Sequence, residues 1–345
     1  MVLAKITQKV LQDKEDRLFE VRIPFASRHL LKIRRNSWRS LTRDPILLSL
    51  FIIIWGLLFL FIVFPLGALI WKIFFTEEGF TLGNLIKTVG HWQNRKALYD
   101  SLLLASLTAS SGVLLGFLFA FTITRTHIHQ VLKSFLNYII IIPLISPPFL
   151  AAFSVVLAFG RQGIITRSLL GLRNVNIYGL PGTWIAETLT YFPTAVLVFI
   201  GVLQSINPNL EDAAFTLGDS KFGIFRKVTL PLAVPGIANA FLLVFAESLA
   251  DFATPLILSG SRFPLLPVQA YLQVTGMYDM AGGATLAFML LIPAFIVFVL
   301  QKYWVERRSR VSILGKPGRK TERRLVGKKM ELLLAGACLS VVIFV

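Results

Sequence analysis

The sequence predicts an all-α membrane protein, and three observations support this fold class. Hydrophobic residues make up 55% of the chain and charged residues only 15%, with a mean hydropathy of +0.71. A water-soluble domain of this length needs more polar surface. The apolar residues gather in long runs that lack the alternation of a barrel strand. Because lipid offers the backbone no hydrogen-bonding partners, each run is expected to be a helix.

About 20 apolar residues are needed to cross a hydrocarbon layer of roughly 30 Å. The chain contains six full runs of this kind and the start of a seventh, Met330–Val345, which is too short to span comfortably. The first run is too long for a signal peptide, so we interpret it as an anchor that is retained. The six full runs are Ile46–Phe75, Leu98–Ile123, Phe135–Gly160, Thr183–Ile206, Ala233–Leu258 and Gly282–Val305.

The formal net charge of +17 is typical of nucleic-acid-binding proteins, but its distribution favours a membrane. Of the 35 lysines and arginines, 27 lie in segments 1–45, 124–134, 207–231 and 302–329. This alternation of basic and less basic loops is the positive-inside pattern. It predicts a multi-pass protein of the cytoplasmic membrane with its amino terminus and the 207–231 loop in the cytoplasm. The basic tails are expected to meet anionic lipid headgroups and not nucleic acid.

The runs and charges divide the chain into segments. We expect the chain to be the front part of a longer protein with a second similar bundle; the alternative is that the last run is a hydrophobic tail. The expected segments are a basic cytoplasmic tail (1–45), a first transmembrane helix (46–75), a five-helix core (98–305) containing the 207–231 loop, a basic cytoplasmic linker (306–329) and the start of a further transmembrane helix (330–345).

The 207–231 loop is the most informative polar segment. Its acidic start, around Glu211, suits the positive end of a helix dipole. Gly218 permits the turn that ends a short helix, and Asp219-Ser220 can cap a second one. Leu230-Pro231 is expected to stop this second helix at the membrane surface. Two short helices joined at a glycine would form a rigid structure that another protein can grip; the alternative is an ordinary amphipathic connector.

A few residues inside the spans are candidates for a translocation pathway. Glu247 and Asp251 are spaced i, i+4, which places them on one face of a helix. Charges at this depth usually face a cavity or a partner, so the pair suits a cationic substrate; the alternative is a structural pair. Pro143 and Pro147, with Pro148, force a kink or a break in the third run.

Other polar and small residues are expected to have structural roles. Glu187 and Asp100 lie at predicted span ends, where solvation is expected. Gly112 and Gly116, four residues apart, predict close helix packing.

Metal and nucleotide sites are not predicted in this chain. Cys338 is the single cysteine and the four histidines are scattered, so no metal site is expected. No glycine-rich loop with the spacing and hydroxyl of a Walker motif occurs. We therefore expect neither catalysis nor a bound cofactor.

The loop residues resemble a known pattern. Asp212-Ala213-Ala214, Gly218 and Val228-x-Leu230-Pro231 are similar to the coupling loop of ATP-binding-cassette (ABC) importer permeases, which has Glu-Ala-Ala, three residues, Gly, nine residues and Ile-x-Leu-Pro. Asp212 stands where the family has Glu, with Glu211 just before it, and Val228 replaces Ile.

Other segments resemble the ferric-iron permeases of this family. These are Phe159-Gly160-Arg161-Gln162-Gly163, Glu247–Phe252, and Arg307-Arg308-Ser309 before a basic linker. The resemblance covers roughly residues 46–345, although permeases for thiamine, polyamines, sulfate and phosphonates share most of it.

The resemblance implies the fold, partners and site residues of such a permease. The fold would be a type I ABC importer bundle, similar to the methionine importer, in a bacterial inner membrane. The partners would be separate ABC ATPase subunits carrying ATP and Mg²⁺, a solute-binding protein on the outer side, and a second permease half in cis or in trans. The coupling residues would be Glu211, Asp212, Ala213, Ala214, Gly218, Leu230 and Pro231.

Two other function classes remain as alternatives. An ion-gradient-driven secondary transporter could use Glu247 and Asp251 as coupling carboxylates. A membrane-embedded enzyme would need a paired-histidine, serine-histidine or metal-ligand constellation inside the spans, and the sequence offers none.

Overall fold

The computed structural model describes residues 45–76, 79–172, 176–305 and 327–344. The predicted basic tail, apart from Pro45, lies outside these residues, as does most of the predicted 306–329 linker. Two compact units are distinguished, residues 1–69 and 70–345, and each is described by itself.

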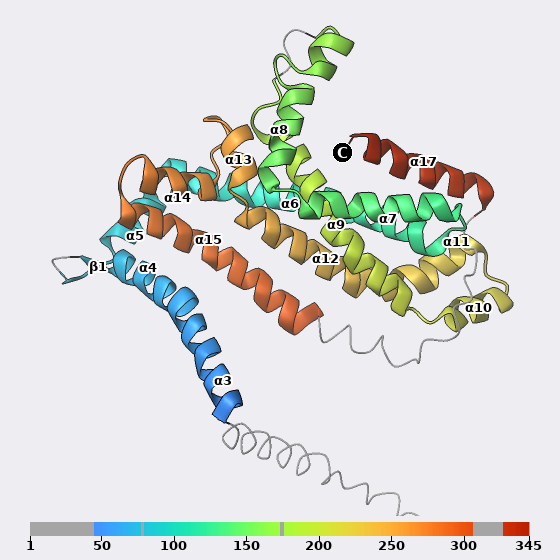
Figure 1. Cartoon of the computed structure of the whole chain (residues 1–345), viewed down its shortest axis with the longest axis horizontal. Helices are drawn as coiled ribbons and strands as arrows, with labels where there is room; N and C mark the ends of the chain where they lie inside the picture. The colour runs from blue at the N-terminus through green and yellow to red at the C-terminus, as the bar shows by residue number, and fades with distance from the viewer. Residues whose placement is uncertain (1–44, 77–78, 173–175, 306–326, 345) are drawn as a thin grey trace, which may run out of the picture. The chain divides into compact units, whose positions relative to one another are not determined.

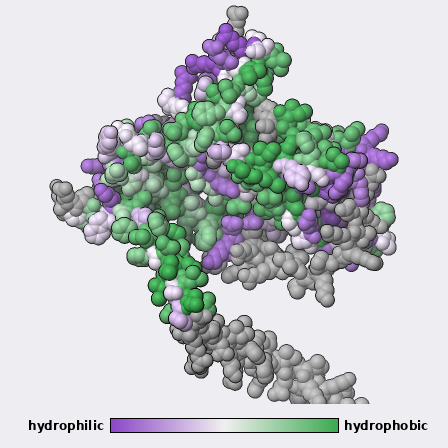
Figure 2. Space-filling view, in the orientation of Figure 1, coloured by the Kyte–Doolittle hydropathy of each residue, from purple (hydrophilic) through white to green (hydrophobic). Residues whose placement is uncertain are grey.

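The described part of the first unit is an apolar helix. It consists of α3 (Pro45–Leu58), a π-helical turn η1 (Phe59–Val63) and the first part of α4 (Phe64–Phe74). Its side chains are mostly exposed, and Figure 2 shows hydrophobic residues along this segment. Such exposure is expected for a helix surrounded by lipid.

In its described residues the second unit is mainly helical, with one short hairpin in which Phe75 lies opposite Phe80. Figure 1 shows the arrangement of its helices. In chain order the elements are β1 (Phe75–Thr76), β2 (Gly79–Phe80), α5 (Gly83–Gly90), α6 (Trp92–Arg125), α7 (Gln130–Ile145), α8 (Pro148–Phe159), η2 (Ile164–Leu169), α9 (Leu180–Ser205), α10 (Pro208–Thr216), α11 (Lys221–Ile224), η3 (Phe225–Thr229), α12 (Leu230–Ala250), α13 (Ala253–Leu258), α14 (Leu266–Thr275), α15 (Met280–Leu300), η4 (Gln301–Val305) and α17 (Lys328–Phe344).

The expected membrane helices are present. Within the described ranges, six helical segments are long and apolar enough to cross a membrane, and α7 is a shorter apolar helix. The six segments are Pro45–Phe74, Trp92–Arg125, Phe149–Leu169, Leu180–Ser205, Lys221–Ala250 and Met280–Tyr303.

The third expected run, Phe135–Gly160, is broken into two helices. α7 ends at Ile145, and α8 begins at Pro148 after Ser146 and Pro147, which both have extended backbone angles. Proline lacks an N–H and disfavours helical geometry in the residue before it. Consecutive prolines therefore end one helix and start the next. Of the two outcomes that the sequence left open, the structure has the break.

The centre of the second unit is formed by α6, α9 and α12. Their contact depends on the two glycines of α6. A Cβ atom at Gly116 would lie 2.6 Å from the Cβ of Ala195, and one at Gly112 would lie 3.3 Å from Cγ1 of Val244. The prediction that these glycines permit close packing is confirmed.

The last helix, α17, packs against α6 and α7. The backbone N–H of His127 donates to Oε1 of Glu331 at 3.1 Å. Deeper in the contact, Cys338 is buried and its Sγ lies 3.6 Å from Oγ1 of Thr122. The start of the expected seventh hydrophobic helix is therefore part of this packed unit.

Candidate functional site

The 207–231 loop contains two short helices joined at a glycine, as predicted. Asn207 begins α10, and its side chain accepts a hydrogen bond from the N–H of Asn209 at 3.0 Å. Gly218 ends the turn after α10 with φ of +89°, a conformation that favours glycine. Ser220 caps α11 by accepting from the N–H of Gly223 at 3.1 Å.

The expected stop at Leu230-Pro231 is wrong. The helix of α11 continues through the π-helical turn η3 into α12, and Pro231 lies in the first turn of α12. In η3 the N–H of Leu230 donates to the carbonyl of Phe225, five residues back. This wider turn accommodates a proline without breaking the helix.

Glu211 anchors the loop to the bundle. Its carboxylate is fully buried, and its Oε2 lies 3.1 Å from Nη1 of Arg125, the last residue of α6. Its Oε1 accepts a hydrogen bond from Thr229 at 3.0 Å. Arg125 also donates through Nη2 to the carbonyl of Leu203 at 2.9 Å, close to the end of α9. We call these four residues the Arg125 clasp.

Burial raises the pKa of Glu211 above its ordinary value, although Arg125 and Thr229 oppose this effect. Glu211 was predicted to lie in the loop, but Arg125 was not predicted to contact it. In the sequence, Arg125 is simply a basic residue at the end of an apolar run.

Large apolar side chains are exposed on the outer surface of the loop, among basic and polar ones. Leu217, which follows α10, is 87% exposed, and three further large hydrophobic side chains are exposed on α10 and α11. Ala213 is also exposed, whereas Ala214 packs against the main core and Asp212 is half-buried. Exposed apolar groups of this kind mark contact surfaces. The three further residues are Leu210, Phe215 and Phe222.

A second group of polar residues lies between α6, α9 and α12. Glu187 on α9 is fully buried, and its Oε2 accepts hydrogen bonds from Thr108 of α6 and Ser248 of α12. Oε1 of Glu247 accepts from Thr194 of α9 at 3.3 Å.

One carboxylate oxygen of each acidic residue in this group is buried without a hydrogen-bonding partner. These oxygens are Oε1 of Glu187, Oε2 of Glu247 and Oδ2 of Asp251. We call Glu187, Glu247 and Asp251 the acidic cluster, and the Tyr191 side chain lies within electrostatic reach of all three.

Two expectations about acidic residues in the spans are wrong. Glu187 is not solvated at a span end, because α9 begins at Leu180 and places it inside the bundle. Asp100 is also buried, and pairs with Lys96 at 2.7 Å. Asp251 follows the last residue of α12 with a φ of −70°, and its N–H donates to the carbonyl of Glu247 at 3.1 Å, so it keeps the expected i, i+4 relation to Glu247.

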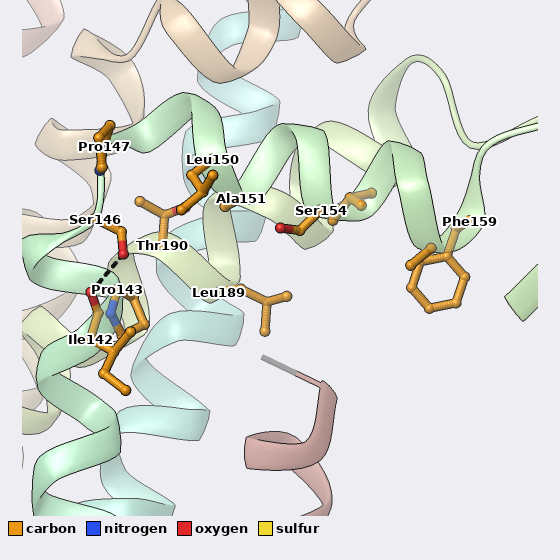
Figure 3. A pocket seen from close by; sticks show the side chains of 12 residues that line it. Ile142, Pro143, Ser146, Pro147, Leu150, Ala151, Ser154, Phe159, Leu189 and Thr190 are labelled. Carbon is orange, nitrogen blue, oxygen red and sulfur yellow. Dashed lines mark hydrogen bonds between the residues drawn. The ribbon is translucent and has the colours of Figure 1, made fainter. Parts of the chain in front are cut away.

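Pro143 and Pro147 line a separate cavity of about 240 Å³ between α7, α8 and α9. Figure 3 shows the labelled side chains around it, and the hydroxyl of Ser146 donates to the carbonyl of Ile142 at 2.9 Å. The lining is mostly apolar, with a hydroxyl group from Thr190 of α9. The structure thus brings the two prolines together but places Glu247 and Asp251 outside this cavity.

The described residues contain no group of three or more His, Cys, Asp or Glu side chains arranged to hold a metal ion.

The contacts described above define two candidate regions. One is the anchored loop with its exposed apolar side chains, and the other is the interior of the bundle with the acidic cluster and the proline-lined cavity.

An anchored polar loop on a bundle of apolar helices is typical of a membrane permease, and comparison with known proteins identifies the class. Residues 112–311 match the family described as binding-protein-dependent transport system inner membrane component. The chain therefore belongs to this family of transport permeases and is a multi-pass inner-membrane protein.

Two relatives illustrate the range of the family. The chain is similar to the ferric transport system permease protein FbpB of Actinobacillus pleuropneumoniae, with 35% identity over 266 residues, 75% of this chain and 38% of that protein. It is also similar to the molybdenum transport system permease protein ModB of Mycobacterium bovis, with 32% identity over 205 residues, 57% of this chain and 76% of that protein. The chain thus spans well under half the length of the ferric relative.

A solved structure shows the same fold. It is the bacterial alginate ABC transporter in complex with an alginate pentasaccharide-bound periplasmic protein. The TM-score is 0.68 at 17% identity, covering 79% of this chain and 98% of that chain. The expected ABC permease fold is confirmed.

Proposed function

We propose that this chain is a permease subunit of an ATP-driven, binding-protein-dependent importer, and that the 207–231 loop is its contact with a separate ATPase. One observation carries the proposal. A two-helix loop, held to the bundle by buried Glu211, exposes Leu210, Phe215, Leu217 and Phe222. A rigid loop with exposed apolar side chains can seat in a groove of a partner and pass force to the bundle.

The remaining coupling positions support this loop. Asp212, Ala213 and Ala214 lie on α10, and Gly218 ends the turn after it. Leu230 and Pro231 begin α12, so that the loop continues directly into a spanning helix. Movement of the loop would therefore be carried along α12.

The proposed partners are those that this mode of transport needs. ATP and Mg²⁺ would bind to the ATPase subunits, because the sequence contains no nucleotide-binding loop. A solute-binding protein would deliver cargo on the outer side. A second permease half, in cis or in trans, would complete the pathway.

The cargo that we propose is ferric iron, on the basis of the similarity to a ferric permease. The acidic cluster agrees with a cationic cargo, since buried carboxylates attract cations. The pathway would pass Glu247, Asp251 and the break at Pro143 and Pro147. The alternative cargo is another small solute, such as thiamine, a polyamine, sulfate or phosphonate.

A different mechanism, in which an ion gradient drives transport, is suggested by the unpaired oxygens of Glu247 and Asp251. ATP dependence separates the two. The chain and its ATPase are reconstituted in proteoliposomes, and the binding protein loaded with ⁵⁵Fe³⁺ is added outside. Uptake is expected only when ATP is enclosed in the vesicles, on the side of the ATPase. Uptake driven by a proton or sodium gradient without ATP would overturn the proposal.

Cross-linking tests the loop contact itself. A Leu217→Cys variant in a Cys338→Ser background is expected to form a disulfide with cysteines placed along the ATPase surface. Ile164→Cys, also an exposed apolar position but on η2, is the matched control and is expected to remain uncross-linked. Absence of any cross-link from Leu217→Cys, or from a similar variant at Phe222, would contradict the proposed contact.

A further inference from the structure

Two polar contacts converge on Arg125, at the point where the 207–231 loop meets the bundle. Its Nη1 lies 3.1 Å from the Glu211 carboxylate, and its Nη2 donates to the carbonyl of Leu203 at 2.9 Å. The first contact reaches the loop and the second reaches the end of α9. Because Arg125 itself ends α6, a single side chain connects two spanning helices to α10.

The chemistry of the clasp makes this connection stiff. A guanidinium group is planar and presents its donors in a fixed fork, so that it fixes both acceptors at once. Leu203 is close enough to the end of α9 for its carbonyl to lack a partner within the helix. Thr229 satisfies the second oxygen of Glu211. Hydrogen bonds to charged groups are stronger than those between neutral groups.

An apolar contact lies beside the clasp. The ring of Phe225 in η3 packs against the rings of Phe117 and Phe121 on α6, with centroids 6.1 Å and 5.5 Å apart. This contact holds η3, but it is non-directional and does not reach α10. The ion pair of Glu211 with Arg125 joins α10 directly to the end of α6.

We propose that Arg125 is a positioning residue for ATP coupling: it transmits movement of α10 to the inner ends of α6 and α9. This inference rests on the proposed function, in which α10 is moved by the ATPase. Without the clasp, α10 would still dock, but it would move about its connections at Ile206 and Gly218. The bundle would then remain in place while ATP is hydrolysed.

The measurement that isolates this role is the stimulation of ATP hydrolysis by the solute-binding protein. It reports communication from the outer face to the ATPase, and it does not depend on the identity of the cargo. In the assembled transporter, Arg125→Gln is expected to retain ATPase binding and basal ATP hydrolysis. The stimulation of hydrolysis by the solute-binding protein is expected to fall at least tenfold. Arg125→Lys keeps the charge but lacks the forked guanidinium group, so its stimulation is expected to lie between that of the unaltered protein and that of Arg125→Gln.

An exchange of the two charges separates positioning from folding. Arg125→Glu combined with Glu211→Arg is expected to recover part of the stimulation that Arg125→Gln loses. The control is Lys96→Gln, which removes an ion pair with Asp100 of 2.7 Å at the opposite end of α6. It is expected to leave stimulation unchanged.

Two results would overturn the inference. One is stimulation of wild-type size in both Arg125→Gln and Arg125→Lys. The other is a loss of stimulation that only matches a loss of assembled protein in these variants, which would make the clasp a folding element. Failure of the proposed function would look different, because the unaltered chain would then bind no ATPase.

Discussion

Asp251 lies two residues before α13, and its Oδ1 accepts a hydrogen bond from the backbone N–H of Ala253 at 2.9 Å. A second, longer contact of 3.4 Å comes from the N–H of Thr254. The first N–H groups of a helix have no partner within it. Asp251 therefore has a structural role at the junction of α12 and α13, in addition to any role in the pathway.

Asp251→Asn separates these two roles, because the Oδ1 of asparagine can accept the same hydrogen bonds without the charge. Asp251→Ala is expected to lower the free energy of unfolding by about 1 kcal/mol, measured by thermal unfolding in detergent, whereas Asp251→Asn is expected to keep it. If the charge serves the pathway, Asp251→Asn loses ⁵⁵Fe³⁺ uptake at wild-type stability. Wild-type uptake in this variant would show that Asp251 has only the structural role.

Much of the fold could be predicted from the sequence, because the length and composition of the apolar runs decide it. The structure has a helix in each expected run. The 207–231 loop was also predicted to contain two helices joined at Gly218, since capping residues and glycine act over a few neighbours. Its π-helical turn before Pro231 depends on register and was not predicted.

Two of the three residues of the acidic cluster were predicted as pathway candidates, and the third was missed for a physical reason. Glu247 and Asp251 were found because they lie inside an apolar run. Glu187 was expected to be solvated, because it lies near the end of the expected run Thr183–Ile206. Its burial depends instead on Thr108 and Ser248, which come from other helices. Contacts between distant segments of this kind have no local signature.

The contact between α6 and α9 at Gly116 gives a stability prediction. A Cβ atom there would lie 3.0 Å from the backbone carbon of Ala195, which cannot rotate away. Gly116→Ala is expected to destabilise the protein by about 1–3 kcal/mol, as other overpacked cores are. Gly201→Ala on α9 is the control, because a Cβ at Gly201 meets nothing within 4 Å. Equal unfolding temperatures for the two variants would contradict the close contact.

Gly218 gives a prediction about coupling. At φ of +89° an L residue costs about 1–2 kcal/mol, but a Cβ there meets nothing within 4 Å. Gly218→Asp is expected to abolish transport while the protein still reaches the membrane. Gly218→Asn tolerates the same backbone without adding a charge, so it is expected to keep most of the transport. Unchanged uptake in Gly218→Asp would contradict a coupling role for this turn.

Glu211 predicts how stability depends on pH. Burial raises its pKa in the folded protein above the ordinary value of 4.5. A raised pKa means that the folded state binds the proton more tightly than the unfolded state does. The contribution of Glu211 to stability is therefore fully present below about pH 4.5 and is lost as the pH rises through the folded pKa.

Glu211→Gln cannot titrate, and all other groups are common to both proteins. The unfolding temperature of Glu211→Gln minus that of the unaltered chain, measured in detergent from pH 4 to pH 8 (roughly the range that brackets a raised carboxyl pKa), is expected to rise with pH. A difference that rises as the pH falls would mean that Arg125 and Thr229 outweigh burial and lower the pKa of Glu211.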